Sequence, residues 1–233
     1  MKLVDLSYTL DEHSPYWPEA APGTPFRAET SATYQHEGFF ARTLRLPEHF
    51  GTHIDAPRHF DVQGRSVDEL PLRELVLEAV VVDVRSSADS DPDYRLTVED
   101  LRNWEAAHGP IPPGGAVLAF TGWGAHWPSQ PRYMNPDGKG VLHFPGFSLA
   151  AAQYLLDRTR PGALGIDTAS IDCGASQNCE VHRLTMHAGI YHLENLAHLE
   201  QMPPAGAVLI ALPLKLRSGS GSPARVVALK GRG

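Results

Sequence analysis

Short apolar runs rich in Val, Ile and Leu recur along the chain, separated by polar or turn-forming residues. Runs of this length with many β-branched residues are typical of buried or half-buried strands. The predicted strands span residues 2–10, 41–48, 79–84, 116–123, 163–170, 189–196, 207–214 and 224–229. Strands therefore form the larger part of the predicted structure.

Two segments between these strands have a helical pattern instead. In TVEDLRNWEAAHG, Thr97 and Asp100 resemble a capping box and Gly109 a stop signal, and SLAAAQYLLDRTRPG begins at Ser148, a good N-cap. The helices are too few for a doubly wound sheet or an eightfold barrel. The order of elements predicts an α/β fold with a mixed, curved sheet and few outer helices. Segments 11–24 and 123–140 are rich in Pro, Gly and aromatic residues, and we expect them to be loops that cover something.

Composition narrows the class of protein. The 233 residues contain no Ser/Gly-rich or Pro-rich linker, so we expect one domain over residues 1–233. A net charge of −7 argues against nucleic acid as a partner. The longest apolar run is far below the roughly 20 residues of a membrane helix, so no membrane partner is expected. The amino terminus lacks a signal-peptide pattern and only two cysteines are present, which favours the cytoplasm.

Three histidines and an aspartate crowd into the segment EHFGTHIDAPRHF, at His49, His53, Asp55 and His59. The Gly and Thr between the first two histidines are poor helix formers, which argues against a helical i, i+4 ligand pair. Pro57 favours an extended conformation for the residue before it. In an extended chain side chains alternate between two sides, so the four residues, all odd-numbered, would point to the same side. Imidazoles with one carboxylate suit zinc, manganese or iron. The cluster therefore predicts a divalent metal site.

The segment HFGTHIDAPRH resembles the HxGTHxDxPxH signature of the cyclase family of metal-dependent hydrolases, which includes bacterial kynurenine formamidase and isatin hydrolase. The likeness continues in GIDTASID, VHRLTMHAGIYHLENL and LPLKLRSGSGSPARVVAL, and so covers most of the chain. The resemblance implies a swivelling β/β/α fold. It also implies that His49, His53 and Asp55 hold the metal and that His59 lies beside it as an acid or base.

The resemblance extends to two later residues, His182 and Glu194. In the two-zinc formamidases they would complete a second zinc site, bridged by the counterpart of Asp55, whereas in the isatin-hydrolase branch one manganese suffices and the histidine lines the pocket. The sequence alone leaves both residues undecided between a surface role and the site. The resemblance gives no role to three further histidines, which we expect to be solvated or structural: His187, His192 and His198.

Such a site indicates hydrolysis. A divalent metal lowers the pKa of its water from 15.7 toward about 7 and polarises a carbonyl. His59, with an ordinary pKa of about 6.5, can take a proton from that water and return it to a leaving nitrogen. We therefore expect the chain to cleave an amide C–N bond, with His59 as the catalytic residue and one or two Zn or Mn ions as the cofactor.

Aromatic residues suggest a flat substrate. Trp17, Phe39, Phe40 and Trp123 can form apolar walls for a small aromatic molecule, such as an aryl formamide or a cyclic amide fused to a ring. The insertion from residue 122 to 148 resembles the isatin-hydrolase branch, which favours the cyclic amide. The resemblance further implies homo-dimers or homo-tetramers whose loops cover neighbouring sites.

Two other functions remain open. The first is a cyclase or dehydratase that uses the same metal to polarise a carbonyl, and the mass of the product separates it from a hydrolase, because hydrolysis adds water. The second is a non-catalytic metal-binding or small-ligand-binding protein. His59 weighs against the second, since a storage site needs no spare base beside its ligands.

Overall fold

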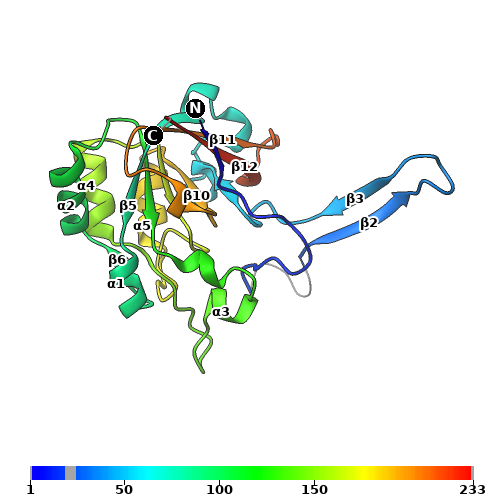
Figure 1. Cartoon of the computed structure of the whole chain (residues 1–233), viewed down its shortest axis with the longest axis horizontal. Coiled ribbons are helices and arrows are strands. Elements are labelled where there is room, and N and C mark those ends of the chain that lie inside the picture. The colour runs from blue at the N-terminus through cyan, green and yellow to red at the C-terminus, as the bar shows by residue number, and fades with distance from the viewer. Residues whose placement is uncertain (1, 19–24, 232–233) are drawn as a thin grey trace.

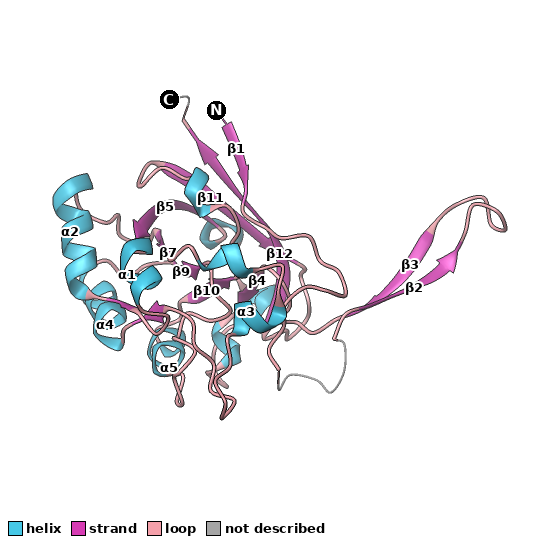
Figure 2. Cartoon of the chain, turned by 60° about the horizontal axis from the view of Figure 1, so that its bottom comes forward, coloured by secondary structure: helices cyan, strands magenta, loops and turns pink. Residues whose placement is uncertain are grey.

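A curved main sheet dominates the computed structural model, which describes residues 2–18 and 25–231. Its strands are β1 (Lys2–Asp5), β4 (His53–Asp55), β5 (Val76–Asp83), β7 (Ala116–Phe120), β9 (Ala163–Ile166), β10 (Tyr191–Glu194), β11 (Ala207–Pro213) and β12 (Gly221–Lys230). The order is β1-β12-β11-β5-β7-β9-β10-β4, and β4 pairs again with β12, so that the sheet closes into a ring flanked by β1 (Figure 2).

The pairing is mixed, as predicted. Neighbours among β5, β7, β9 and β10 are parallel, whereas the pairings of β4, β11, β12 and β1 are antiparallel. The helices are α1 (Arg85–Ser90), α2 (Val98–His108), α3 (Gln130–Met134), α4 (Leu149–Arg158) and α5 (Glu180–His187). The predicted caps are present: Thr97 and Asp100 form a capping box for α2, and the Ser148 hydroxyl accepts a hydrogen bond from the Ala151 amide at the start of α4.

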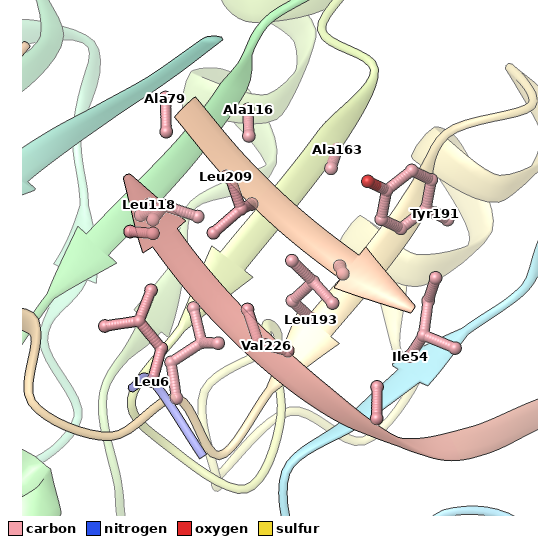
Figure 3. Packing of buried hydrophobic residues seen from close by; sticks show 14 of the residues in the cluster. Leu6, Ile54, Ala79, Ala116, Leu118, Ala163, Tyr191, Leu193, Leu209 and Val226 are labelled. Atoms are coloured by element: carbon pink, nitrogen blue, oxygen red, sulfur yellow. The ribbon is translucent and has the colours of Figure 1, made fainter. Parts of the chain in front are cut away.

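Alternation along the strands gives the sheet two apolar faces. In β5, Ala79 and Val81 point into the ring, while Val80 and Val82 point outward to the cluster that includes Trp104 of α2 and residues of α4. Figure 3 shows the ring interior, filled by side chains such as Leu118, Leu209 and Val226. Helices cover the outer face of the sheet, and its inner face lines the closed ring. Strands buried on both faces need continuous apolar sequences, which the central strands of this sheet have.

Other segments differ from the prediction. The hairpin of β2 (Arg27–Ala32) and β3 (Ala41–Arg45) extends away from the body (Figure 1), and β2 was not predicted because its polar sequence has no apolar run. Short strands β6 (Arg95–Leu96) and β8 (Gly146–Phe147) also pair. The expected loop 123–140 contains a 3-10 turn at Trp123–His126 and α3. Of the expected loop 11–24, residues 19–24 lie outside the described residues.

Among the helices of the described residues, none has the length and apolar character needed to cross a membrane.

Candidate metal centre

The register of β4 against β10 assembles the centre. His53 lies opposite Glu194, and Asp55 lies opposite His192, while Ile54 and its partner Leu193 face the ring interior between them. Because side chains alternate along a strand, the polar residues of both strands leave the sheet on its outer face. α5 packs over this face and contributes the buried His182.

The backbone that carries the four motif residues differs from the predicted extended chain. The extended segment covers only His53–Asp55, and Pro57 begins a single 3-10 turn that ends at His59. Proline fits the first position of such a turn because its φ is already near the helical value. The turn brings the His59 ring to 4.0 Å from the ring of His49, which precedes the strand. The four residues meet, although one run of extended chain does not join them.

Two carboxylates lie between the histidines. The Asp55 Oδ1 atom is 2.5 Å from His49 Nδ1 and 3.1 Å from His53 Nε2, and its Oδ2 atom is 3.4 Å from His182 Nε2. Glu194 is arranged in the same way, with Oε2 3.5 Å from His53 Nε2 and Oε1 3.3 Å from His182 Nε2. Asp55 therefore faces three histidines and Glu194 faces two, so each carboxylate lies between imidazole rings.

Hydrogen bonds on the far side of two rings set which nitrogen faces the carboxylates. His53 Nδ1 lies 2.8 Å from the carbonyl oxygen of Gly51, and His182 Nδ1 lies 2.7 Å from Asp172 Oδ2. Both partners are acceptors, so Nδ1 carries the hydrogen and donates it, and each Nε2 keeps a lone pair for a cation.

His49 is held by the same principle with its nitrogens exchanged. The Ser220 hydroxyl donates to Glu48, so it accepts a hydrogen bond from His49 Nε2 at 2.9 Å, and Nδ1 faces Asp55. Gly221 leaves room for this ring, because a Cβ atom there would lie 2.5 Å from His49 Cε1.

The donor set fits a divalent metal. Lone pairs of imidazole nitrogens and carboxylate oxygens repel one another unless a proton or a cation lies between them. Ligand atoms about 2.0–2.1 Å from a tetrahedral zinc are about 3.3–3.4 Å apart, and four of the five N···O separations here lie between 3.1 and 3.5 Å. Two subsites result, one of His49, His53 and Asp55 and one of Asp55, His182 and Glu194.

The electrostatics agree with this arrangement. Burial opposes ionisation of Asp55, but the neighbouring His49 and His53 and hydrogen bonds from His182 hold its pKa well below the usual value. Burial alone would lower the pKa of His53, but the Asp55 and Glu194 charges raise it to about 9. Without a cation the site therefore attracts protons, and metal and proton compete for the same nitrogens.

His59 has a different environment. Desolvation of its ring lowers its pKa to about 4, against the opposing charge of Asp55. The ring makes an edge contact with Phe60 at 4.8 Å and lines the pocket above the cluster. At neutral pH, His59 is thus an uncharged imidazole that can accept a proton.

The cluster lies at the wall of a pocket of about 760 Å³. Trp17 lines this pocket and packs edge-on against Phe144, with ring centroids 6.1 Å apart. The insertion contributes further walls through Tyr133, Met134 and Leu142. The pocket is thus large enough for a bicyclic aromatic molecule.

The other three predicted substrate contacts lie elsewhere. Trp123 is 8% exposed and its Nε1 donates to the Tyr133 carbonyl, so it supports the pocket wall from behind and lines a separate cavity of about 860 Å³. Phe39 and Phe40 lie beside the outer end of the hairpin, 56% and 51% exposed, outside the pocket of their own chain. Aromatic content alone cannot separate a core residue from a pocket residue.

Several residues of the centre were not predicted. Asn195, at a positive φ of 55°, donates to the Gly51 carbonyl that also orients His53, and Asp172 orients His182. His192, expected to be solvated or structural, is fully buried beside the cluster. Its spacing of two from Glu194 on a predicted strand was the available signal. His187 and His198 are exposed, in agreement with the expectation.

The sequence is similar to a known family and to named enzymes. The family model named Cyclase matches residues 4–173. Isatin hydrolase from Roseibium aggregatum is 33% identical, over 98% of this chain and 92% of its own length. Kynurenine formamidase from Salinibacter ruber is 31% identical, over 97% of both chains.

The fold is likewise similar to solved structures of isatin hydrolases. Isatin hydrolase A from Labrenzia aggregata, bound to benzyl benzoate, superposes with a TM-score of 0.92 at 36% identity, covering 99% of this chain and 94% of that one. An isatin hydrolase bound to the product analogue thioisatinate gives 0.91 at 31% identity, covering 99% and 93%.

Proposed function

Because the chain belongs to the cyclase family of metal-dependent hydrolases, we propose that it hydrolyses the amide C–N bond of a small aromatic substrate. The observation that carries this proposal is the set of buried carboxylates and oriented imidazoles at the pocket wall, with His59 beside them. His49, His53, Asp55, His182 and Glu194 would hold one or two divalent ions, zinc or manganese.

A bound divalent ion supplies an acidified water and a polarised carbonyl. The chain supplies the rest. His59 accepts a proton from the attacking water and returns it to the leaving nitrogen, so that the amine departs neutral. The protein groups behind the histidines, such as Asp172 behind His182, keep the imidazole lone pairs directed at the ions.

For the substrate, we propose a cyclic amide fused to an aromatic ring. Trp17 offers an apolar face at the pocket wall, and the insertion adds Tyr133, Met134 and Leu142. The isatin hydrolases superpose with TM-scores of 0.91–0.92, against 0.75 and 0.74 for structures described as a potential and a predicted metal-dependent hydrolase. The pocket wall and the likeness to isatin hydrolases support the cyclic amide.

We further propose that the chain acts as a homo-dimer or homo-tetramer in the cytoplasm. The hairpin of β2 and β3 carries Phe39, Phe40 and Leu44 with more than half of each exposed, an unusual arrangement for a free arm. Packing against a second copy would cover them and bring the two phenylalanines toward a neighbouring pocket. The free thiols of Cys173 and Cys179 suit a reducing compartment. Light scattering of the purified chain tests the assembly.

The decisive experiment combines metal analysis with an assay resolved by product mass. The purified protein is incubated with isatin and with N-formylkynurenine, with and without a chelator. We expect a gain of one water on isatin that the chelator abolishes and that added zinc or manganese restores. Loss of water or unchanged mass in a turned-over carbonyl compound would support the cyclase or dehydratase alternative, and turnover indifferent to chelator would contradict metal-dependent hydrolysis.

A further inference from the structure

His192 occupies a place in the centre that the proposed chemistry does not use. It lies on β10 opposite Asp55 and two residues before Glu194, so its side chain leaves the sheet on the same face as both carboxylates. It is fully buried, and one of its ring nitrogens lies within 4.8 Å of ligand atoms of Asp55, His182 and Glu194.

A threonine on α5 decides which nitrogen of His192 is free. The Thr185 hydroxyl donates its hydrogen to the Val181 carbonyl at 2.7 Å. It therefore accepts the hydrogen bond of 2.7 Å that joins it to His192 Nε2. Nε2 carries the hydrogen, and Nδ1 keeps a lone pair.

This Nδ1 lone pair has no hydrogen-bond partner within residues 2–18 and 25–231, although the atom is buried. An unsatisfied buried acceptor destabilises a fold unless something binds it. Its surroundings direct no hydrogen at it: Asp55 and Glu194 are carboxylates, and the His182 ring, edge-on at 4.7 Å, directs Nδ1 at Asp172 and Nε2 at Asp55 and Glu194. A group of acceptors without a donor is the chemistry that a cation satisfies.

We propose that His192 is a fourth protein ligand, through Nδ1, of the cation held by Asp55, His182 and Glu194. The inference rests on the proposed metal centre and adds a ligand to it. With His192 this subsite has two nitrogens and two oxygens, all from buried residues, whereas His49, His53 and Asp55 offer three protein ligands. Both subsites border the same pocket, and we expect the subsite with four protein ligands to bind its ion more tightly.

The test counts ions and measures their affinities in the full chain. Chelator-stripped protein is titrated with Zn²⁺ by calorimetry, and bound zinc is measured by mass spectrometry after dialysis. For the wild type we expect two ions of unequal affinity. In His192→Leu the tighter ion should bind at least about 100-fold more weakly, while the weaker ion is retained. The matched control is His187→Leu, which removes an exposed histidine from the end of α5 and should keep both affinities.

Two further measurements cover the case in which His192→Leu fails to fold. Thr185→Val removes the acceptor that orients the ring, and we expect the tighter ion alone to bind about 10-fold more weakly. In wild-type protein with ¹⁵N-labelled histidine, zinc should shift the Nδ1 resonance of His192, whereas Nδ1 of His182 stays protonated.

The outcomes separate this inference from the proposed function. Wild-type affinities in His192→Leu, a single ion in the wild type, or an Nδ1 resonance unmoved by zinc would each overturn the fourth ligand, and an unmoved resonance would point to a buried water instead. Chelator-sensitive hydrolysis alongside any of these results would leave the proposed function intact. A protein that binds no ion and turns over substrate regardless of chelator would refute the proposed function itself.

Discussion

The two faces of β4 and β10 carry opposite chemistry on adjacent residues. Ile54 and Leu193 point into the ring and are fully buried among apolar side chains (Figure 3). Asp55 and Glu194, each the next residue along, point outward to the metal centre. The comparison teaches that the apolar core specifies the register of the two strands, and so which ligands lie opposite one another on the other face. Substitutions on either face should therefore have separable effects, on stability inside and on chemistry outside.

The largest expected effect comes from the outer face, with Asp55→Asn. Asp55 faces His49, His53 and His182, so the neutral amide removes a bridging charge from both subsites. We expect metal content to fall and turnover to drop about 1,000-fold or more, since the ion supplies several kcal/mol. Metal analysis and the isatin assay measure both, and the exposed Asp89→Asn is the matched control. Full turnover in Asp55→Asn would place the chemistry elsewhere.

His59→Ala should separate proton transfer from metal binding. A ring nitrogen of His59 lies within 4.8 Å of ligand atoms of His49 and Asp55, but His53 completes that subsite without it. We therefore expect turnover to fall about 100-fold to 10,000-fold with metal content nearly intact. Loss of metal together with turnover would instead make His59 a ligand.

On the inner face, Ile54→Ala should act on stability. Removing a fully buried Ile side chain leaves a cavity and lowers the free energy of unfolding by about 2–5 kcal/mol. Denaturant titration measures the change, with Val62→Ala, at a residue 80% exposed, as a control expected within about 0.5 kcal/mol. Metal stoichiometry should stay at the wild-type value. A stability loss no larger than that of the control would show that β4 is not held by its inner face.

The metal-free protein should lose stability as the pH rises. The pKa of His53 is raised from 6.5 to about 9 in the folded chain, so protonated His53 contributes stability that is fully present below pH 6.5. That contribution is lost as the pH rises through about 9. We expect the Tm of chelated protein to fall by several degrees between pH 6.5 and 9.5, and His53→Gln to flatten the dependence. Added zinc should reverse the trend, because deprotonated ligands bind metal better.

The smallest effect is expected at the pocket wall. Trp17→Ala should raise KM for an aromatic substrate about 10-fold through lost apolar contact. Trp123→Phe should leave KM unchanged and lower stability by about 1 kcal/mol, since it loses the hydrogen bond to the Tyr133 carbonyl behind the wall. Steady-state kinetics separate the two residues, and a raised KM in Trp123→Phe would return it to the substrate site.

Much of the fold could be predicted from local patterns. The apolar runs at β5, β7, β9 and β11 and the caps of α2 and α4 follow from periodicity and side-chain hydrogen bonding, which act over a few residues. β2 could not be predicted in this way, because its polar sequence pairs only with β3 and packs no core. The positions of the aromatic side chains could not be predicted for a similar reason: Trp17 lines the pocket and Trp123 lies behind its wall, although both have the same chemistry and differ only in what surrounds them.

The sequence by itself determined the kind of chemistry, because His49, His53, Asp55 and His59 lie in one short segment and no other use of so many ionisable groups is common. Only the tertiary structure decided which residues complete the centre. Strand register places Glu194 opposite His53 and His192 opposite Asp55, and the packing of α5 brings His182 to Asp55. Register and packing depend on contacts between residues far apart in the chain, and the hydrogen bonds that orient each imidazole exist only after those contacts form.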